Sequence, residues 1–143
     1  MLRKPLLICA FVLLVSLLAV CLDPAVFRGN PQHTGIYDAP GIAQFSRVKW
    51  KFHTGGYVIS SPAVANRTLY VGSSDGNLYA VALDSGTQKW KFAAKSRVAS
   101  SPAVSDGLVY FNVYDGNFYA VDAKTGQLKW KFQTGGEIGR AHV

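Results

Sequence analysis

SSPAVANRTLYVGSSDGNLYAVALDSGTQKWKF occupies residues 60–92 of this 143-residue chain, and a close copy of it occupies residues 100–132. Both copies open with SSPAV and close with KWKF. The KWKF phrase also precedes the first copy, so that Trp50, Trp90 and Trp130 recur at one fixed spacing. Without a gap, residues 50–89 and 90–129 are identical at 18 of 40 positions. The chain is therefore built from a repeated supersecondary unit of about 40 residues.

The second copy predicts four short strands, at residues 98–105, 108–114, 117–122 and 128–133. Asp106-Gly107 and Asp115-Gly116 separate the first three, and residues 124–126 form the turn before the fourth. Asp-Gly pairs between β-rich runs indicate hairpins, because a type I′ turn needs positive φ at both central residues. Four antiparallel strands in a repeat of this length are typical of a β-propeller blade.

Residues 48–52 alternate between apolar and basic side chains, which predicts a further strand with its tryptophan turned toward a core. Six of the 15 basic residues flank the three tryptophans at fixed spacing, as Lys49, Lys51, Lys89, Lys91, Lys129 and Lys131. A net charge of +7 suggests an anionic partner only where it is clustered. This regular placement favours a solvated strand face, and we expect no nucleic-acid partner.

The segment Ala120-Val121-Asp122-Ala123-Lys124-Thr125-Gly126-Gln127-Leu128-Lys129-Trp130 resembles the tryptophan-docking motif of pyrroloquinoline-quinone (PQQ)-like repeat β-propellers. The first copy keeps Gly86 and Trp90 but has Ala82 in place of Asp122. The resemblance covers about residues 48–132, with a leader at 27–35. It implies an all-β fold, a partial propeller of about two four-stranded blades. The apolar run within residues 1–22 predicts a helix before it.

The same resemblance implies roles for the motif residues. Trp50, Trp90 and Trp130 would pack between neighbouring blades. Gly86, Gly126 and Thr125 would shape the turn before the outer strand, in the motif that Asp122 belongs to.

Such repeats occur in quinoprotein oxidoreductases, which hold PQQ and Ca²⁺, and in non-enzymatic relatives typified by the outer-membrane assembly factor BamB. The chain has no Cys-Cys pair of the kind found beside the quinone. Asp75 and Asp115 are candidate cation ligands, but both lie in Asp-Gly-Asn phrases, where turn chemistry also accounts for them. His33, His53 and His142 are scattered, so we expect no catalytic residue, metal or cofactor.

Residues 1–22 combine Arg3 and Lys4 with an apolar run, as in an export signal or membrane anchor. The region around Cys21 resembles a bacterial lipobox, although Val20 departs from the small residue that precedes the lipidated cysteine. Cleaved signal, retained anchor and lipoprotein remain three alternatives. Each exports the rest of the chain across the inner membrane, to a membrane-anchored, periplasmic or extracellular position.

The remaining organisation follows from composition. Residues 23–46 are rich in Pro, Gly and Asn and are expected to form a linker, and residues 47–136 form an incomplete set of propeller repeats. Residues 137–143 depart from the repeat and resemble a translated cloning sequence; a natural early stop is the alternative. The favoured function is an exported, membrane-associated scaffold that binds proteins through its loops. A fragment of a quinoprotein oxidoreductase and a sensor ectodomain are the alternatives.

Overall fold

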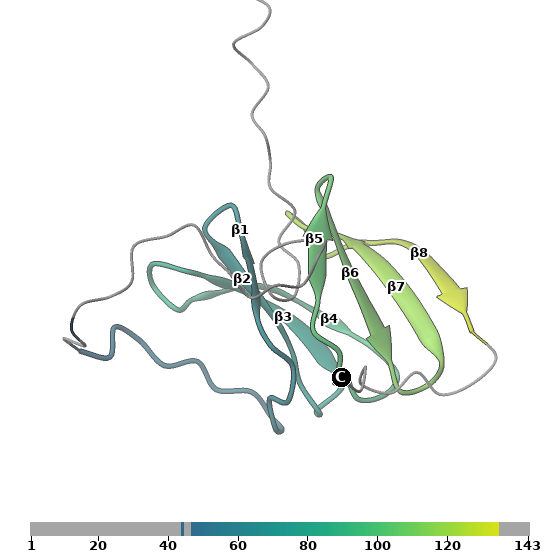
Figure 1. Cartoon of the computed structure of the whole chain (residues 1–143), viewed down its shortest axis with the longest axis horizontal. Coiled ribbons are helices and arrows are strands. Elements are labelled where there is room, and N and C mark those ends of the chain that lie inside the picture. The colour runs from purple at the N-terminus through teal and green to yellow at the C-terminus, as the bar shows by residue number, and fades with distance from the viewer. Residues whose placement is uncertain (1–43, 45–46, 135–143) are drawn as a thin grey trace, which may run out of the picture.

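The structure, a computed structural model, describes residue 44 and residues 47–134, which form two four-stranded antiparallel sheets (Figure 1). Sheet 1 contains β1 (Ala63–Ala65), β2 (Thr68–Gly72), β3 (Asn77–Ala82) and β4 (Gln88–Ala93). Sheet 2 contains β5 (Ala103–Ser105), β6 (Leu108–Val113), β7 (Asn117–Asp122) and β8 (Leu128–Gln133). Within each sheet, every strand pairs with the next in sequence. The prediction of two propeller blades is confirmed.

The predicted apolar helix within residues 1–22, the linker at 23–46 and the tail at 137–143 lie outside the described residues, apart from residue 44. In the part of the chain that the structure does describe, no helix is long and apolar enough to span a membrane.

The hairpin turns form where the sequence indicates them. Asp106 and Gly107 both have positive φ, of 50° and 74°. At the same turn of sheet 1, Asn66 and Arg67 have φ of 48° and 55°. A side chain is tolerated at Arg67 because a Cβ at the equivalent Gly107 would meet no atom within 4 Å. The type I′ geometry therefore survives a change of sequence, at the cost of left-handed backbone in two non-glycine residues.

Two predicted strands differ from the structure. The strand predicted at 98–105 is reduced to β5, because Val98 donates its N–H to the Ser73 carbonyl of sheet 1 and not to a ladder partner. The strand predicted at 48–52 is absent, since no strand among residues 47–134 pairs with this segment. Alternation predicts which face a segment buries, whereas a strand also needs a neighbour.

Both sheets carry an irregularity at the same place. Ala80 pairs with Trp90 and Val81 with Gln88, so Lys89 has no opposite residue in the register. Sheet 2 repeats this at Lys129. Such a bulge bends and twists the outer strand next to the tryptophan that the motif places there.

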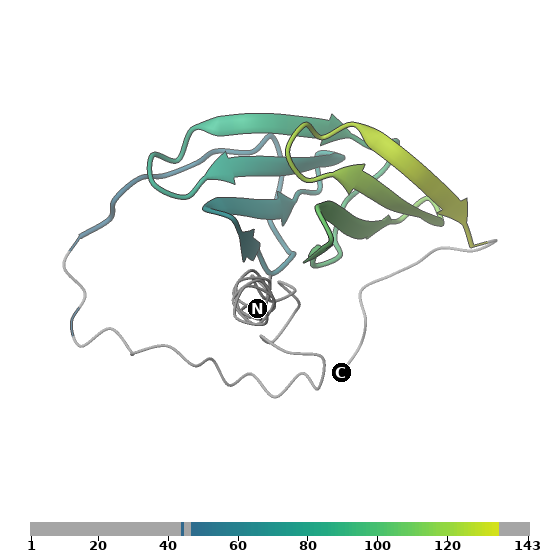
Figure 2. The same cartoon turned by 90° about the horizontal axis from the view of Figure 1, so that it is seen from above.

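The main core lies between the two sheets, which Figure 2 shows side by side. Its fully buried side chains include Leu78 of sheet 1 and Val109, Phe111, Val113 and Val121 of sheet 2. Phe92 of β4 reaches across to Phe111 and Tyr119, with ring centroids 5.8 and 5.5 Å apart. A sheet of this kind buries its apolar surface against the next sheet rather than within itself.

Candidate functional site

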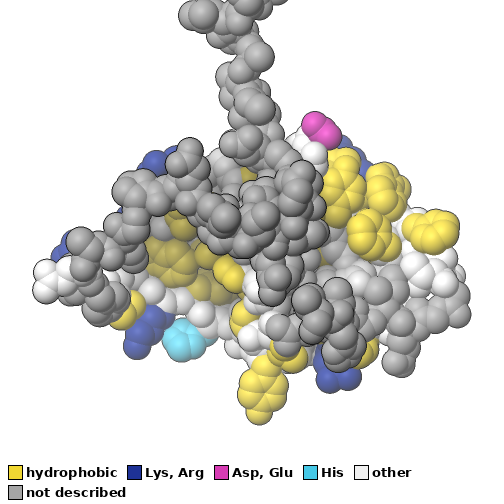
Figure 3. All heavy atoms as spheres, in the orientation of Figure 1, with side chains coloured by type: hydrophobic (Ala, Val, Ile, Leu, Met, Phe, Trp, Pro, Cys, Tyr) yellow, Lys and Arg dark blue, Asp and Glu magenta, His cyan; other side chains and the backbone are white. Residues whose placement is uncertain are grey.

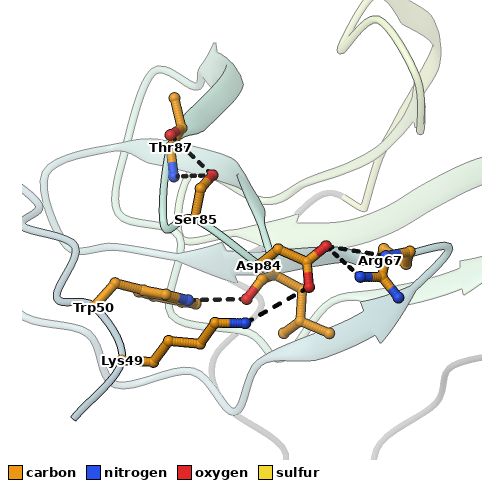
Figure 4. Close-up of polar contacts among 7 residues, drawn as sticks. Lys49, Trp50, Arg67, Asp84, Ser85 and Thr87 are labelled. Atoms are coloured by element: carbon orange, nitrogen blue, oxygen red, sulfur yellow. Dashed lines mark hydrogen bonds and ion pairs between the residues drawn. The ribbon is translucent and has the colours of Figure 1, made fainter.

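The first candidate site is the place where Trp50 meets the turn between β3 and β4 (Figure 4). The Trp50 indole N–H donates to the Leu83 carbonyl at 2.9 Å. Its ring lies against Gly86, where an added Cβ would come within 2.7 Å of ring atoms. Lys49 and Arg67 both pair with Asp84, at 3.7 and 2.6 Å. The lack of a side chain at Gly86 thus makes space for the Trp50 ring, and the Leu83 carbonyl of the same turn accepts its N–H.

Trp90 repeats this arrangement on sheet 2. Its indole N–H donates to the Ala123 carbonyl at 3.1 Å, and a Cβ at Gly126 would lie 2.7 Å from its ring atoms. Tyr70 also donates its hydroxyl to the Ala123 carbonyl, at 3.0 Å. One backbone oxygen of sheet 2 therefore holds two aromatic side chains of sheet 1.

Trp130 occupies the equivalent position on β8 but has a different environment. Its side chain is 44% exposed, whereas Trp50 and Trp90 are half-buried. It contacts the rings of Tyr110 and Phe118, both in its own sheet, with centroids 6.0 Å away. Among the described residues, Trp130 therefore packs on rings of its own sheet and not against a second sheet.

Asp122 and Thr125 organise the turn on which Trp90 rests. The Asp122 carboxylate accepts hydrogen bonds from the Thr125 N–H at 2.9 Å, the Thr125 hydroxyl at 3.1 Å and the Lys124 N–H at 3.0 Å. The Lys129 ammonium lies 3.2 Å away. The Thr125 N–H and then Lys129 lower the pKa of Asp122 to about 2. The turn at Ala82 in sheet 1 has no such carboxylate.

A second candidate region is the rim formed by the β2–β3 and β6–β7 turns. Asp75 accepts from the Asn77 N–H at 3.0 Å, the Tyr79 hydroxyl at 2.7 Å and the Gly55 N–H at 2.8 Å. Burial acts to raise the pKa of Asp75, but these hydrogen bonds outweigh it and lower the pKa. Asp115 likewise accepts from the Asn117 N–H at 3.1 Å. Both carboxylates have the geometry of Asx turns.

Gly55 and Tyr57 bond to the β2–β3 turn of this rim, and Tyr57 is 83% exposed there. Its backbone is fixed all the same, because Ser74 donates its N–H to the Tyr57 carbonyl at 2.9 Å and accepts the Tyr57 N–H at 2.7 Å. The next repeat places Arg97 there, over the ring of Tyr114 at 4.7 Å. An aromatic and a cationic side chain are thus presented at one rim.

Sequence reasoning missed the acceptors. Leu83 and Ala123 accept the indole N–H through their backbone carbonyls, which every residue type has. The one regularity in the sequence is that each acceptor lies 33 residues after its tryptophan. Sequence reasoning treated Ser60 and Ser100 as structural residues of the repeat but did not give their partners. Each hydroxyl both accepts from and donates to the backbone of one residue, Gly72 or Asn112 respectively, at 2.9–3.0 Å.

Within residues 47–134, no group of three or more His, Cys, Asp or Glu side chains is placed to hold a metal ion. Asp75 and Asp115 lie in separate turns. Asp75 and Asp115 each bond within their own turn and do not come together as one cation site.

Comparison with protein families gives a match over residues 34–142 to the family described as outer membrane protein assembly factor BamB. No curated protein matches the chain. Among solved structures, BamB from Moraxella catarrhalis is similar with a TM-score of 0.55 and 17% identity. That match covers 59% of this chain and 26% of the other, and at this identity it shows the fold alone.

Two other similar structures are enzymes. A europium-containing methanol dehydrogenase has a TM-score of 0.56 and 26% identity, covering 63% of this chain and 18% of the enzyme. Quinohemoprotein alcohol dehydrogenase from Comamonas testosteroni has a TM-score of 0.51 and 26% identity, covering 55% and 13%. The chain thus spans about a quarter or less of the structures that it resembles.

Proposed function

Because the chain belongs to the family of outer membrane protein assembly factor BamB, we propose that it is a non-enzymatic, exported scaffold that binds other proteins at the bacterial cell envelope. Residues 1–22 would carry it to the membrane, and the loops of one rim would bind the partner. The roles of the tryptophan-docking residues are part of the same proposal: they hold the blades together so that the rim loops keep their spacing.

The observation that carries this proposal is Tyr57. Its side chain is 83% exposed while its backbone is held by two hydrogen bonds to Ser74. The uncovered end of sheet 1 does not explain this exposure, because the equivalent Arg97 is also exposed, beside a seam that is covered. An exposed aromatic on a fixed backbone loses little backbone entropy when it binds, and tyrosine and arginine are common where protein interfaces are strongest.

The test uses the full chain, produced in a bacterium with a photoreactive residue in place of Tyr57. We expect crosslinks to envelope proteins in the membrane or periplasmic fraction. A photoreactive residue in place of Lys91, which is also exposed but lies on β4 away from the rim, is the matched control. Equal crosslinking from both positions, or recovery of the chain in the cytosol, would contradict the proposal.

The second candidate is a part of a PQQ-dependent oxidoreductase, favoured by the two dehydrogenases that share 26% identity with the chain. PQQ titrated into the purified chain with Ca²⁺ or a lanthanide separates the two functions. A scaffold is expected to leave the absorbance and fluorescence of PQQ unchanged. Saturable binding, together with dye reduction when an alcohol is added, would establish the enzyme instead.

A further inference from the structure

The β7–β8 turn of sheet 2 shows how several donors share one carboxylate. Asp122 accepts the N–H groups of Lys124 and Thr125, at 3.0 and 2.9 Å, and the Thr125 hydroxyl at 3.1 Å. The Lys129 ammonium lies 3.2 Å from the other oxygen. Lys129 is the bulge residue of β8, and a bulge re-aims a side chain. Backbone, hydroxyl and ammonium donors therefore converge on one anionic group.

The β3–β4 turn of sheet 1 has the equivalent donors but no carboxylate. Ala82 stands at the position of Asp122, and Asp84, Ser85 and Lys89 stand at the positions of the donors. Among the described residues, the N–H groups of Asp84 and Ser85 have no acceptor. Lys89 forms no ion pair there either. This turn thus has the donors of an anion site and lacks the anion.

The side-chain donors of this turn bond to neutral hydroxyls. Ser85 donates its hydroxyl to Thr87 at 2.9 Å (Figure 4). The Lys89 ammonium donates to the Thr68 hydroxyl at 2.6 Å. Thr68 lies opposite Ala82 in the register of β2 and β3, so the ammonium stays beside the position that lacks a carboxylate. Both donors are therefore close to an anion that enters there.

The backbone of the two turns has the same form. Gly86 and Gly126 have φ of 72° and 74°. Their N–H groups donate to the carbonyls of Ala82 and Asp122, at 2.9 and 2.8 Å. The conformation of the turn thus does not depend on the carboxylate. Successive backbone N–H groups in turns form concave sites that bind anions.

The charges around the β3–β4 turn do not cancel this attraction. The carboxylate of Asp84 is paired with Arg67 at 2.6 Å and Lys49 at 3.7 Å. Figure 3 shows Lys and Arg side chains at separate places around the edge of the visible face and not in one patch. A general attraction for anions therefore does not select a site on this face, whereas converging donors do.

A cavity beside the turn leaves room for a ligand. It has a volume of about 570 Å³ and lies at the seam between the two described sheets, with Lys89 and Thr68 on one wall. Asp122 and Lys124 are on the opposite wall. The charge of Asp122 is balanced by Lys129, so this wall admits an anion. A carboxylate at the turn can thus carry a side chain or a small organic molecule into the cavity.

We propose that the β3–β4 turn binds a carboxylate of another molecule, in the place that the Asp122 side chain takes in the next repeat. The N–H groups of Asp84 and Ser85 and the Ser85 hydroxyl donate to one carboxylate oxygen. Lys89 leaves its hydroxyl acceptor and binds the other. Hydrogen bonds to an ionised acceptor are stronger than those between neutral groups, which favours this exchange. The inference does not depend on the proposed scaffold function.

Amide NMR of the full chain in detergent tests the proposal, with acetate as the probe and chloride at equal ionic strength as the reference. We expect acetate to move the amide protons of Asp84 and Ser85 downfield, toward the positions of the bonded Lys124 and Thr125 amides. The shift should saturate over millimolar acetate. Chloride should not produce it. No saturable shift at these two amides, or the same shift with chloride, would overturn the proposal.

Two variants exchange the site between the turns. Ala82→Asp supplies the carboxylate within the chain and should abolish the response to acetate. Asp122→Ala should create a second site, at which acetate moves the amides of Lys124 and Thr125. Because one variant loses binding and the other gains it, misfolding cannot imitate the pair of results. Undiminished binding in Ala82→Asp, or no second site in Asp122→Ala, would each contradict the proposal.

Lys89→Met measures the part played by the ammonium. It should raise the acetate concentration at half-saturation about threefold, because the lost charge pair is exposed. Lys91→Met is the matched control. Lys91 is exposed on the same strand but lies opposite Tyr79, on the other face of the sheet, and its loss should leave binding unchanged. Equal weakening by both variants would show general charge attraction instead.

Two sources of the carboxylate are distinguished by a capped peptide with a single aspartate. Half-saturation at a much lower concentration than acetate identifies the acidic side chain of a bound protein as the ligand. Half-saturation at the same concentration as acetate identifies a small organic acid. Both results uphold a carboxylate site. The same peptide with asparagine in place of aspartate should not bind, and equal binding of the two peptides would overturn the proposal.

Discussion

At the residue scale, two glycines with the same φ have different structural roles. Gly107 and Gly126 both have φ of 74°, but only Gly126 faces an indole, that of Trp90. Gly107→Ala should cost about 1 kcal/mol, from left-handed backbone alone. Gly126→Ala should cost about 2–4 kcal/mol, because a Cβ 2.7 Å from the ring adds overpacking. Urea unfolding of the two variants measures the difference, and equal losses would show that Trp90 yields freely.

Asp122 offers a prediction on pH. Its folded pKa of about 2 lies below the ordinary value of 3.8, so its hydrogen bonds stabilise the fold fully above about pH 4. That contribution is lost as the pH falls from about 4 toward 2. Asp122→Ala should lower the melting temperature at pH 6 and flatten its dependence on pH in this window. Ala82→Asp, which copies the second turn into the first, should raise the melting temperature at pH 6 and leave it unchanged at pH 2.

These residues also show how far sequence reasoning reaches. The repeat period identified Trp50, Trp90, Gly86 and Gly126, because the docking motif has one residue type at each of these positions. It did not show which side chains contact Trp130, because that depends on what packs on β8 and not on residue type. The carbonyl acceptors at Leu83 and Ala123 were invisible for the same kind of reason: every residue has a carbonyl.

At the scale of elements, β7 and β8 match the predicted ranges 117–122 and 128–133, and β5 does not match the predicted 98–105. Local pattern suffices where a hairpin brings the partner strand. Residues 98–102 instead cross between sheets, and their contacts with Ser73 and Asn112 are made over distances that pattern does not encode.

The outer strands β4 and β8 allow the stability contributions of two equivalent tryptophans to be compared. Trp90 of β4 bonds to sheet 2 and packs in the main core, so Trp90→Ala should destabilise the fold by about 3 kcal/mol. Trp130 of β8 has contacts only with rings of its own sheet among those described, so Trp130→Ala should cost less than about 1 kcal/mol in dilute monomer. Denaturant titration at low concentration compares them. A larger loss for Trp130 than for Trp90 would contradict an exposed environment for Trp130.

At the scale of the whole molecule, the apolar cluster between the two sheets should make residues 63–122 unfold as one cooperative unit. Amide hydrogen exchange followed by mass spectrometry should be slowest in β2, β3, β6 and β7, whose central positions are buried. Residues 47–54 and β8 should exchange fastest, by at least about a hundredfold. Uniform protection across residues 47–134 would contradict this prediction.

The six lysines beside the tryptophans have a consequence for how copies can meet. Among residues 47–134, strands β4 and β8 each pair with a neighbour on one side only, and open hydrogen-bonding edges of this kind are templates for fibre growth. Lys91 and Lys131 are exposed on those strands, as are Lys89 and Lys129. Two such edges brought side by side would align like charges. The lysines thus disfavour a cross-β stack while leaving the aromatic faces of the sheets available.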